Sequence, residues 1–159
     1  MRSYAVLSHV GFGDIRFGMS RSDVFDLLGP WEYLQPPDPF VGDSVCFYDG
    51  SSLAISIDQA NTVGAIESRG CPFIVEGTDL RGLGWSELTR FISALDPATE
   101  IDESKSSITS RHLGLAANTA DDETPQGILA FQPGYYDRPR NDKIDMAAWF
   151  ERIARERQS

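Results

Sequence analysis

The sequence predicts an α+β protein in which helices pack on one face of an antiparallel sheet. Runs of alternating apolar and polar residues, such as Leu53 to Ile57, are typical of half-buried strands. Turn residues separate these runs, as they do in strands joined by hairpins. Other segments repeat apolar residues with the spacing of an α-helix, so that each helix can cover the sheet with one side.

Length and charge limit the classes of function. The 159 residues have the size of one domain, so we predict a single α+β domain over residues 1–159. The formal net charge of −10 disfavours direct binding to nucleic acid or to an anionic membrane surface. Composition leaves two roles open for the acidity: it maintains solubility, or it steers a basic partner toward the protein.

The cysteines and histidines predict no metal site and no cofactor. Cys46 and Cys71 form no CxxC pair, and His9 and His112 lie far from them in the sequence, unlike the closely spaced ligands of a zinc site. The N-terminal residues lack a sustained apolar run, and no window reaches the length of a membrane span. We therefore expect a cytoplasmic protein with reduced thiols.

A strand, a glycine turn and a helix are predicted within residues 11–30. Gly18 permits the sharp turn after the strand. Ser20 has the character of an N-cap, and Asp23 is placed to complete a capping box. Gly29-Pro30 is expected to end the helix with an αL-type cap. The residues expected on the buried side of this helix are Val24, Phe25 and Leu28.

Residues 30–43 are predicted to form a long loop, because they contain four prolines. Loops of this length often carry function. The aromatic residues of the loop either cover the core or anchor a partner, and the sequence leaves both open. The candidate partner-binding residues in this loop are Trp31, Tyr33, Asp38, Phe40 and Asp43.

Three strands of the sheet are predicted between residues 45 and 69. Asp49-Gly50 is typical of a tight hairpin turn between the first two strands. Cys46 lies in the first strand and is expected to be a small buried residue. Cys71 follows the third strand at a Gly-Cys-Pro break and is expected to be more exposed.

The second part of the chain repeats this plan. Leu83-Gly84-Trp85-Ser86 matches Phe17-Gly18-Met19-Ser20 in pattern, and a helix follows in both cases. We therefore predict two similar helix-plus-strands half-units, at about 11–76 and 80–133. The helix of the second half-unit is expected to end at Asp96-Pro97. Its expected core stripe consists of Leu88, Phe91, Ile92 and Leu95.

After this helix, residues 96–106 are predicted to form a polar loop. Ser107 to Asn118 is predicted as one strand with a bulge near Ser110, and His112 is expected on its wetter side. Gly127 to Phe131 is the last predicted strand. A closing helix is expected at about 143–156. Its apolar stripe is expected to consist of Met146, Trp149, Phe150 and Ile153.

Two loops near the last strand add further candidate partner-binding residues. An acidic turn precedes this strand, and an aromatic loop follows it. We expect the aromatic side chains to act as anchors and the carboxylates to steer a basic partner. The candidates in these two loops are Asp121, Asp122, Glu123, Tyr135 and Tyr136.

The segment Ile15-x-x-Gly18-Met19-Ser20-x-x-x-Val24-x-x-x-Leu28-Gly29 resembles a helix opening of small bacterial α+β domains, G-M-S/T-x-x-x-V-x-x-x-L-G-x-P. Such domains include outer-membrane assembly lipoproteins of the SmpA/OmlA type and the β-lactamase-inhibitor-protein fold. A similar opening occurs in cytoplasmic immunity proteins of polymorphic toxin systems. The close match extends over residues 11–30. No lipobox cysteine precedes the motif here, and Pro30 comes one position early.

The inhibitor-like branch of this resemblance implies a non-catalytic protein that presents a concave sheet and loops to a target enzyme. Our first hypothesis is therefore an immunity protein that binds and neutralises a cognate, basic bacterial toxin. The second is a structural or assembly module of the SmpA type. The third is a small enzyme that uses Cys71 or His112. The sequence does not predict the oligomeric state.

Overall fold

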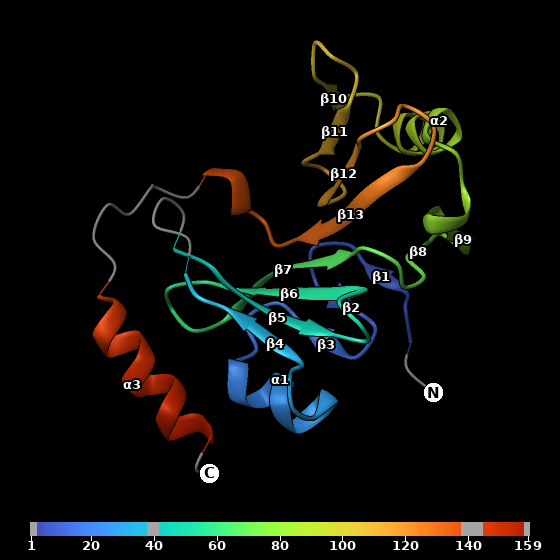
Figure 1. Cartoon of the computed structure of the whole chain (residues 1–159). Helices are drawn as coiled ribbons and strands as arrows, with labels where there is room; N and C mark the ends of the chain where they lie inside the picture. The colour runs from blue at the N-terminus through green and yellow to red at the C-terminus, as the bar shows by residue number, and fades with distance from the viewer. Residues whose placement is uncertain (1–2, 38–41, 138–144, 158–159) are drawn as a thin grey trace.

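A computed structural model describes residues 3–37, 42–137 and 145–157. These residues form an α+β structure with three α-helices and a large antiparallel sheet, which confirms the predicted class. The sheet has eight strands in the order β10-β11-β12-β13-β7-β6-β5-β4 (Figure 1). Its strands are β4 (Tyr33–Gln35), β5 (Ser44–Tyr48), β6 (Leu53–Ile57), β7 (Val63–Ser68), β10 (Glu100–Ile101), β11 (Ser107–Ser110), β12 (Leu115–Thr119) and β13 (Pro125–Phe131).

A helix precedes each group of four consecutive strands in this sheet. α1 (Arg21–Leu28) precedes β4 to β7, which we call the first half, and α2 (Trp85–Leu95) precedes β10 to β13, the second half. The halves join where β7 pairs with β13, with Ile66 opposite Ala130. Strand direction turns strongly between β4 and β11, as expected for a twisted sheet (Figure 1).

One face of the sheet carries the main hydrophobic core. Side chains at alternate strand positions point to this covered face, among them Ile55, Ile66 and Ile128, which are fully buried. Val24 of α1 and Leu88 of α2 belong to the same cluster. Both helices therefore contribute to the core on the covered face.

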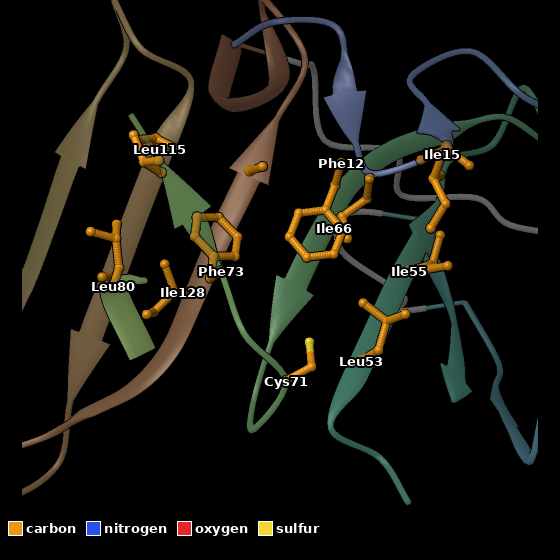
Figure 2. Close-up of a cluster of buried hydrophobic side chains, with 14 of the residues drawn as sticks. Phe12, Ile15, Leu53, Ile55, Ile66, Cys71, Phe73, Leu80, Leu115 and Ile128 are labelled. Carbon is orange, nitrogen blue, oxygen red and sulfur yellow. The ribbon is translucent and has the colours of Figure 1, made fainter. Parts of the chain in front are cut away.

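Short strands outside the large sheet contribute further side chains to the core on the covered face. They are β1 (Val6–Leu7), β2 (Gly11–Phe12), β3 (Ile15–Arg16), β8 (Ile74–Val75) and β9 (Thr78–Asp79), followed by the 3-10 turn η1 (Leu80–Gly82). Figure 2 shows Phe12 of β2, Ile15 of β3 and Phe73, which directly precedes β8, gathered with sheet residues such as Ile66. The rings of Phe12 and Phe73 lie 5.4 Å apart.

The predicted start of α1 is confirmed. Ser20 Oγ accepts a hydrogen bond from the Asp23 amide, and the Asp23 carboxylate accepts one from the Ser20 amide, both at 3.0 Å. The predicted αL cap is wrong, because Gly29 has φ 84° and ψ −167°, which lies outside the αL region. Glycine is still required there, since side chains disfavour a positive φ.

Three loop or strand predictions are also wrong. The predicted loop at 30–43 contains strand β4, and the predicted loop at 96–106 contains the two-residue strand β10. The single strand predicted from Ser107 to Asn118 is a hairpin of β11 and β12, with Gly114 at φ 70° in the turn. Ile108 and Leu115 both face the core although an odd number of positions separates them in the sequence. The reason is the chain reversal between β11 and β12, not a bulge within one strand.

α3 (Met146–Arg157) packs against the start of α1. Glu156 Oε2 lies 3.0 Å from Arg21 Nη1, and the Arg21 side chain is only 1% exposed. Arg21 Nη2 donates to Ser44 Oγ at 3.1 Å, and the Arg21 guanidinium lies 5.9 Å from the Trp149 ring. A buried guanidinium needs such a counter-charge, so α3 supplies part of the environment that Arg21 requires.

The apolar stripes of α2 and α3 are narrower than predicted. In α2, Leu88 and Ile92 are fully buried, whereas Leu95 is 39% exposed. In α3, Trp149 and Ile153 are buried, but Phe150 is 54% exposed. Each helix thus buries its central stripe residues and leaves a flanking apolar residue in solvent.

Candidate functional site

The face of the sheet opposite the main core carries a continuous row of side chains, one from each strand. Paired residues on neighbouring antiparallel strands point to the same face, so the strand register fixes this row. We call this side of the sheet the open face and this set of side chains the cross-strand row. In order, its members are Tyr33, Phe47, Ala54, Glu67, Leu129, Ala116, Thr109 and Glu100.

The end of the row in the first half is aromatic. Tyr33 is 57% exposed, and its ring centroid lies 5.7 Å from that of Phe47. The Arg69 guanidinium lies 5.1 Å from the Phe47 centroid, a cation–π distance. Arg69 Nε also donates to Glu67 Oε1 at 3.0 Å. Strands β4, β5 and β7 thus hold an aromatic pair beside an ion pair.

A depression of about 190 Å³ lies over the second half of the row. Its floor includes Ala116, Gly127 and Leu129, which leave room above the strands. A Cβ atom on Gly127 would lie 2.7 Å from Glu67 Oε1 and 3.1 Å from Asn118 Oδ1. Glycine at this position therefore lets these two polar side chains converge at the depression. We call it the central pocket.

The 3-10 turn η2 (Tyr135–Asp137) forms one wall of the central pocket. Tyr136 lines it and packs edge-on against Phe131, with ring centroids 4.9 Å apart. Arg111 lies 5.9 Å from the Tyr136 ring and donates to Asp137 Oδ1 at 2.8 Å. This hydrogen bond is the main reason that the pKa of Arg111 is raised.

The candidate residues of the 30–43 segment do not share one environment. Tyr33 lies on the open face and is exposed. Trp31 is half-buried and packs edge-on against Phe25 of α1 at 5.6 Å, so it covers the core. Asp43 is buried and accepts a hydrogen bond from the Tyr135 hydroxyl at 3.4 Å. Asp38 and Phe40 lie outside the described residues.

The acidic turn lies between β12 and β13, at the start of α2. Asp121 Oδ1 accepts hydrogen bonds from the amides of Glu123 at 2.9 Å and Thr124 at 2.8 Å. These bonds lower the pKa of Asp121 from 3.8 to about 2. Asp121 therefore shapes the turn, while Asp122 and Glu123 are exposed.

The thiols are poor candidates for nucleophiles. Cys71 is 6% exposed, which contradicts the predicted exposure at the Gly-Cys-Pro break. Burial raises the pKa of Cys71, and it raises that of Cys46 to about 11. Both are therefore protonated at neutral pH, whereas the thiolate is the reactive form. His112 is exposed, in the turn between β11 and β12.

The structure and the comparisons add three negative findings. Among the described residues, no three His, Cys, Asp or Glu side chains are grouped so that they can hold a metal ion. No helix in the described part of the chain has the length and apolar character to cross a membrane. Comparison with family models, curated proteins and solved structures gave no match.

The sequence prediction missed most of the cross-strand row. Phe47, Glu67 and Leu129 were assigned to strands but not to a site. Their alternation with buried residues carried a usable signal, because every second strand residue faces away from the core. The row itself required the register between strands distant in the sequence, such as Glu67 opposite Leu129.

Proposed function

We propose that this chain is a non-catalytic protein-binding inhibitor, and that it binds its partner through the open face. The observation that carries this proposal is the cross-strand row, which runs over all eight strands, with the aromatic pair at one end and the central pocket over its second half. A broad sheet face with aromatic side chains at its surface has the composition of a protein interface. Taken with the resemblance of residues 15–29, it favours an immunity protein acting on a bacterial toxin in the cytoplasm.

Two exposed tyrosines are the proposed anchors. Tyr33 is 57% and Tyr136 is 45% exposed, and both rings rest on buried aromatic neighbours, Phe47 and Phe131. A rigid, partly supported tyrosine loses little conformational entropy on binding, and tyrosines are enriched at energetically important interface positions. Tyr33 lies on β4 in the first half, and Tyr136 lies on η2 beside β13 of the second half, so that one partner can engage both.

The charge of the chain favours a basic partner. The formal net charge of −10 attracts a protein of opposite sign and speeds its encounter. Asp122 and Glu123, exposed on the acidic turn, contribute to this long-range attraction. Asp43 and Asp121 are committed to internal hydrogen bonds, so we assign them structural roles instead.

The proposal extends to the architecture. We propose that the two halves are repeats of one helix-plus-four-strands unit, as the matching patterns before α1 and α2 predict. The mirrored strand order on either side of the β7–β13 pair supports this view. Such a repeat gives a small protein a broad sheet face without requiring a larger fold.

The test uses the protein encoded next to this chain in its genome as the candidate toxin. We expect co-expression of this chain to restore growth, and the two proteins to co-purify. Joint substitution of Tyr33→Ala and Tyr136→Ala should weaken binding by about tenfold or more. Leu27→Ala is the matched control, because Leu27 is 44% exposed on α1.

The outcomes separate the hypotheses. Rescue that survives the double tyrosine substitution would contradict the open face as the binding surface. Absence of both binding and rescue with every neighbouring gene product would contradict the inhibitor function. A dimer in solution that the tyrosine substitutions dissociate would instead favour the assembly-module hypothesis. Activity that is lost in Cys71→Ser would favour the enzyme hypothesis.

A further inference from the structure

The central pocket combines one carboxylate with neutral polar groups and an aromatic wall. Glu67 provides the carboxylate, with its side chain 29% exposed. The hydroxyls of Ser107 and Thr109 and the amide group of Asn118 also line the pocket, and Tyr136 provides the aromatic wall. The carboxylate only accepts hydrogen bonds, and the two hydroxyls can accept as well as donate them. Acceptors thus lie beside a ring, an arrangement that suits a planar cation.

Glu67 retains the capacity to bind another donor. Its Oε1 accepts a hydrogen bond from Arg69 Nε at 3.0 Å, whereas a carboxylate offers about four acceptor positions. The Arg69 guanidinium lies over the Phe47 ring, 5.1 Å from its centroid. It thus belongs to the aromatic end of the row, while the pocket extends from Glu67 toward Thr109 and Tyr136.

Charges around the pocket favour a cation over an anion. Arg111, whose guanidinium lies 5.9 Å from the Tyr136 ring, is ion-paired with Asp137 at 2.8 Å and with Glu100 at 3.5 Å. Among the residues that the structure describes around the pocket, the three carboxylates of Glu67, Glu100 and Asp137 outnumber the two guanidinium groups of Arg69 and Arg111. Glu67 is paired with Arg69, so the excess negative charge arises from Glu100 and Asp137, which share Arg111 beside the Tyr136 ring.

We propose that the central pocket receives an arginine side chain of the partner protein; this inference rests on the proposed inhibitor function. The guanidinium would donate hydrogen bonds to Glu67 and Thr109 and stack against Tyr136. Arginine suits such a site better than lysine, because its planar group can form parallel hydrogen bonds and stack on a ring at the same time. A volume of about 190 Å³ accommodates the head group of this side chain.

The first test needs no partner and uses ethylguanidinium as the probe, with ethylurea as its neutral isostere. We expect ethylguanidinium to produce saturable NMR shifts at the amides of Glu67, Thr109 and Asn118. Glu67→Gln should weaken this binding by about tenfold or more, because it removes a charged hydrogen-bond acceptor. Glu103→Gln is the matched control, since Glu103 lines a different depression, between α2 and β11.

Three results would overturn the assignment of the pocket. They are an absence of shifts with ethylguanidinium, equal shifts with ethylurea, and undiminished binding in Glu67→Gln. The spectrum of Glu67→Gln also reports whether the variant is folded, so that a loss of binding can be attributed to the carboxylate.

The second test separates this inference from the proposed function. With an identified partner, Glu67→Gln should reduce affinity about tenfold, and Glu103→Gln should not. If the tyrosine variants lose the partner while Glu67→Gln binds normally, the function stands and the arginine pocket is wrong. If ethylguanidinium binds as expected but no neighbouring gene product does, the pocket stands and the inhibitor function is wrong.

Discussion

The two helices that precede the halves of the sheet begin in different ways. α1 is capped by its own sequence, through the reciprocal hydrogen bonds of Ser20 and Asp23. α2 has Gly84 at the equivalent position and no side-chain cap. The Trp85 amide instead donates to the Glu123 carbonyl at 2.8 Å, across to the turn between β12 and β13. The first helix thus uses a local cap, and the second depends on tertiary structure.

The rest of α2 follows the same principle. Trp85 Nε1 donates to the Lys105 carbonyl at 3.0 Å, on the segment before β11. At the other end of the helix, the buried Asp96 carboxylate accepts a hydrogen bond from Ser110 Oγ at 2.6 Å. Helix and strands of the second half are therefore tied together by side chains and carbonyls distant in sequence, which a local pattern does not reveal.

The largest expected effect tests whether the two halves nevertheless share one core. Leu53 in the first half and Leu115 in the second are both at most 1% exposed. We expect Leu53→Ala and Leu115→Ala each to lower the free energy of unfolding by about 3 kcal/mol, because each leaves a cavity. Urea unfolding followed by circular dichroism measures this. A variant that unfolds in two separate transitions would show that the halves are stable independently.

A smaller effect distinguishes the two helix starts. Ser20→Ala should lower the free energy of unfolding by about 1 kcal/mol, because the Asp23 amide loses its acceptor. Ser86 occupies the matching sequence position before the second stripe, but it is exposed inside the first turn of α2. We expect Ser86→Ala to change stability by less than about 0.5 kcal/mol. Equal losses of stability in the two variants would contradict the conclusion that α1 has a local cap and that α2 depends on tertiary structure.

Asp121 lies in the turn whose Glu123 carbonyl caps α2, and its contribution to the free energy of unfolding should depend on pH. The folded pKa of Asp121, about 2, lies below its ordinary value of 3.8, so ionised Asp121 favours the folded state. This contribution is complete above about pH 4 and is lost as the pH falls through the folded pKa. Wild type should therefore be more stable than Asp121→Asn at pH 6, and the difference should vanish toward pH 2. A difference that persists at pH 2 would contradict this explanation.

The features predicted correctly from the sequence are those that depend on residues close together in the chain. The capping box at Ser20 and the turn at Asp49-Gly50, where both residues have positive φ, follow from neighbours a few positions apart. β4 and β10 escaped prediction because their pairing partners, not their own residues, make them strands. β4 owes its extended form to β5, with Tyr33 opposite Phe47.

The residues of the candidate site differ in the same way: some could be selected from the sequence, and others depend on contacts between distant segments. Tyr33 and Tyr136 were selected as aromatic residues of two predicted loops, and the structure places both on the open face. Trp31 was also selected, but the nearby Phe25 ring gives it a packing role that composition does not reveal. Glu67 was not selected, because a carboxylate within a predicted strand gains its setting only when β13 and η2 lie beside it.

The outermost strands determine how other chains can approach this sheet. β10 has two residues and β4 has three, so each edge offers few backbone hydrogen-bonding groups for an added strand. Short edge strands of this kind protect a sheet against fibrous self-assembly. Main-chain pairing with a foreign strand would give little affinity here, so a partner of the kind proposed above would have to be recognised through side chains. The specificity of such a protein can then change through substitutions on one face, while its strand pairing is retained.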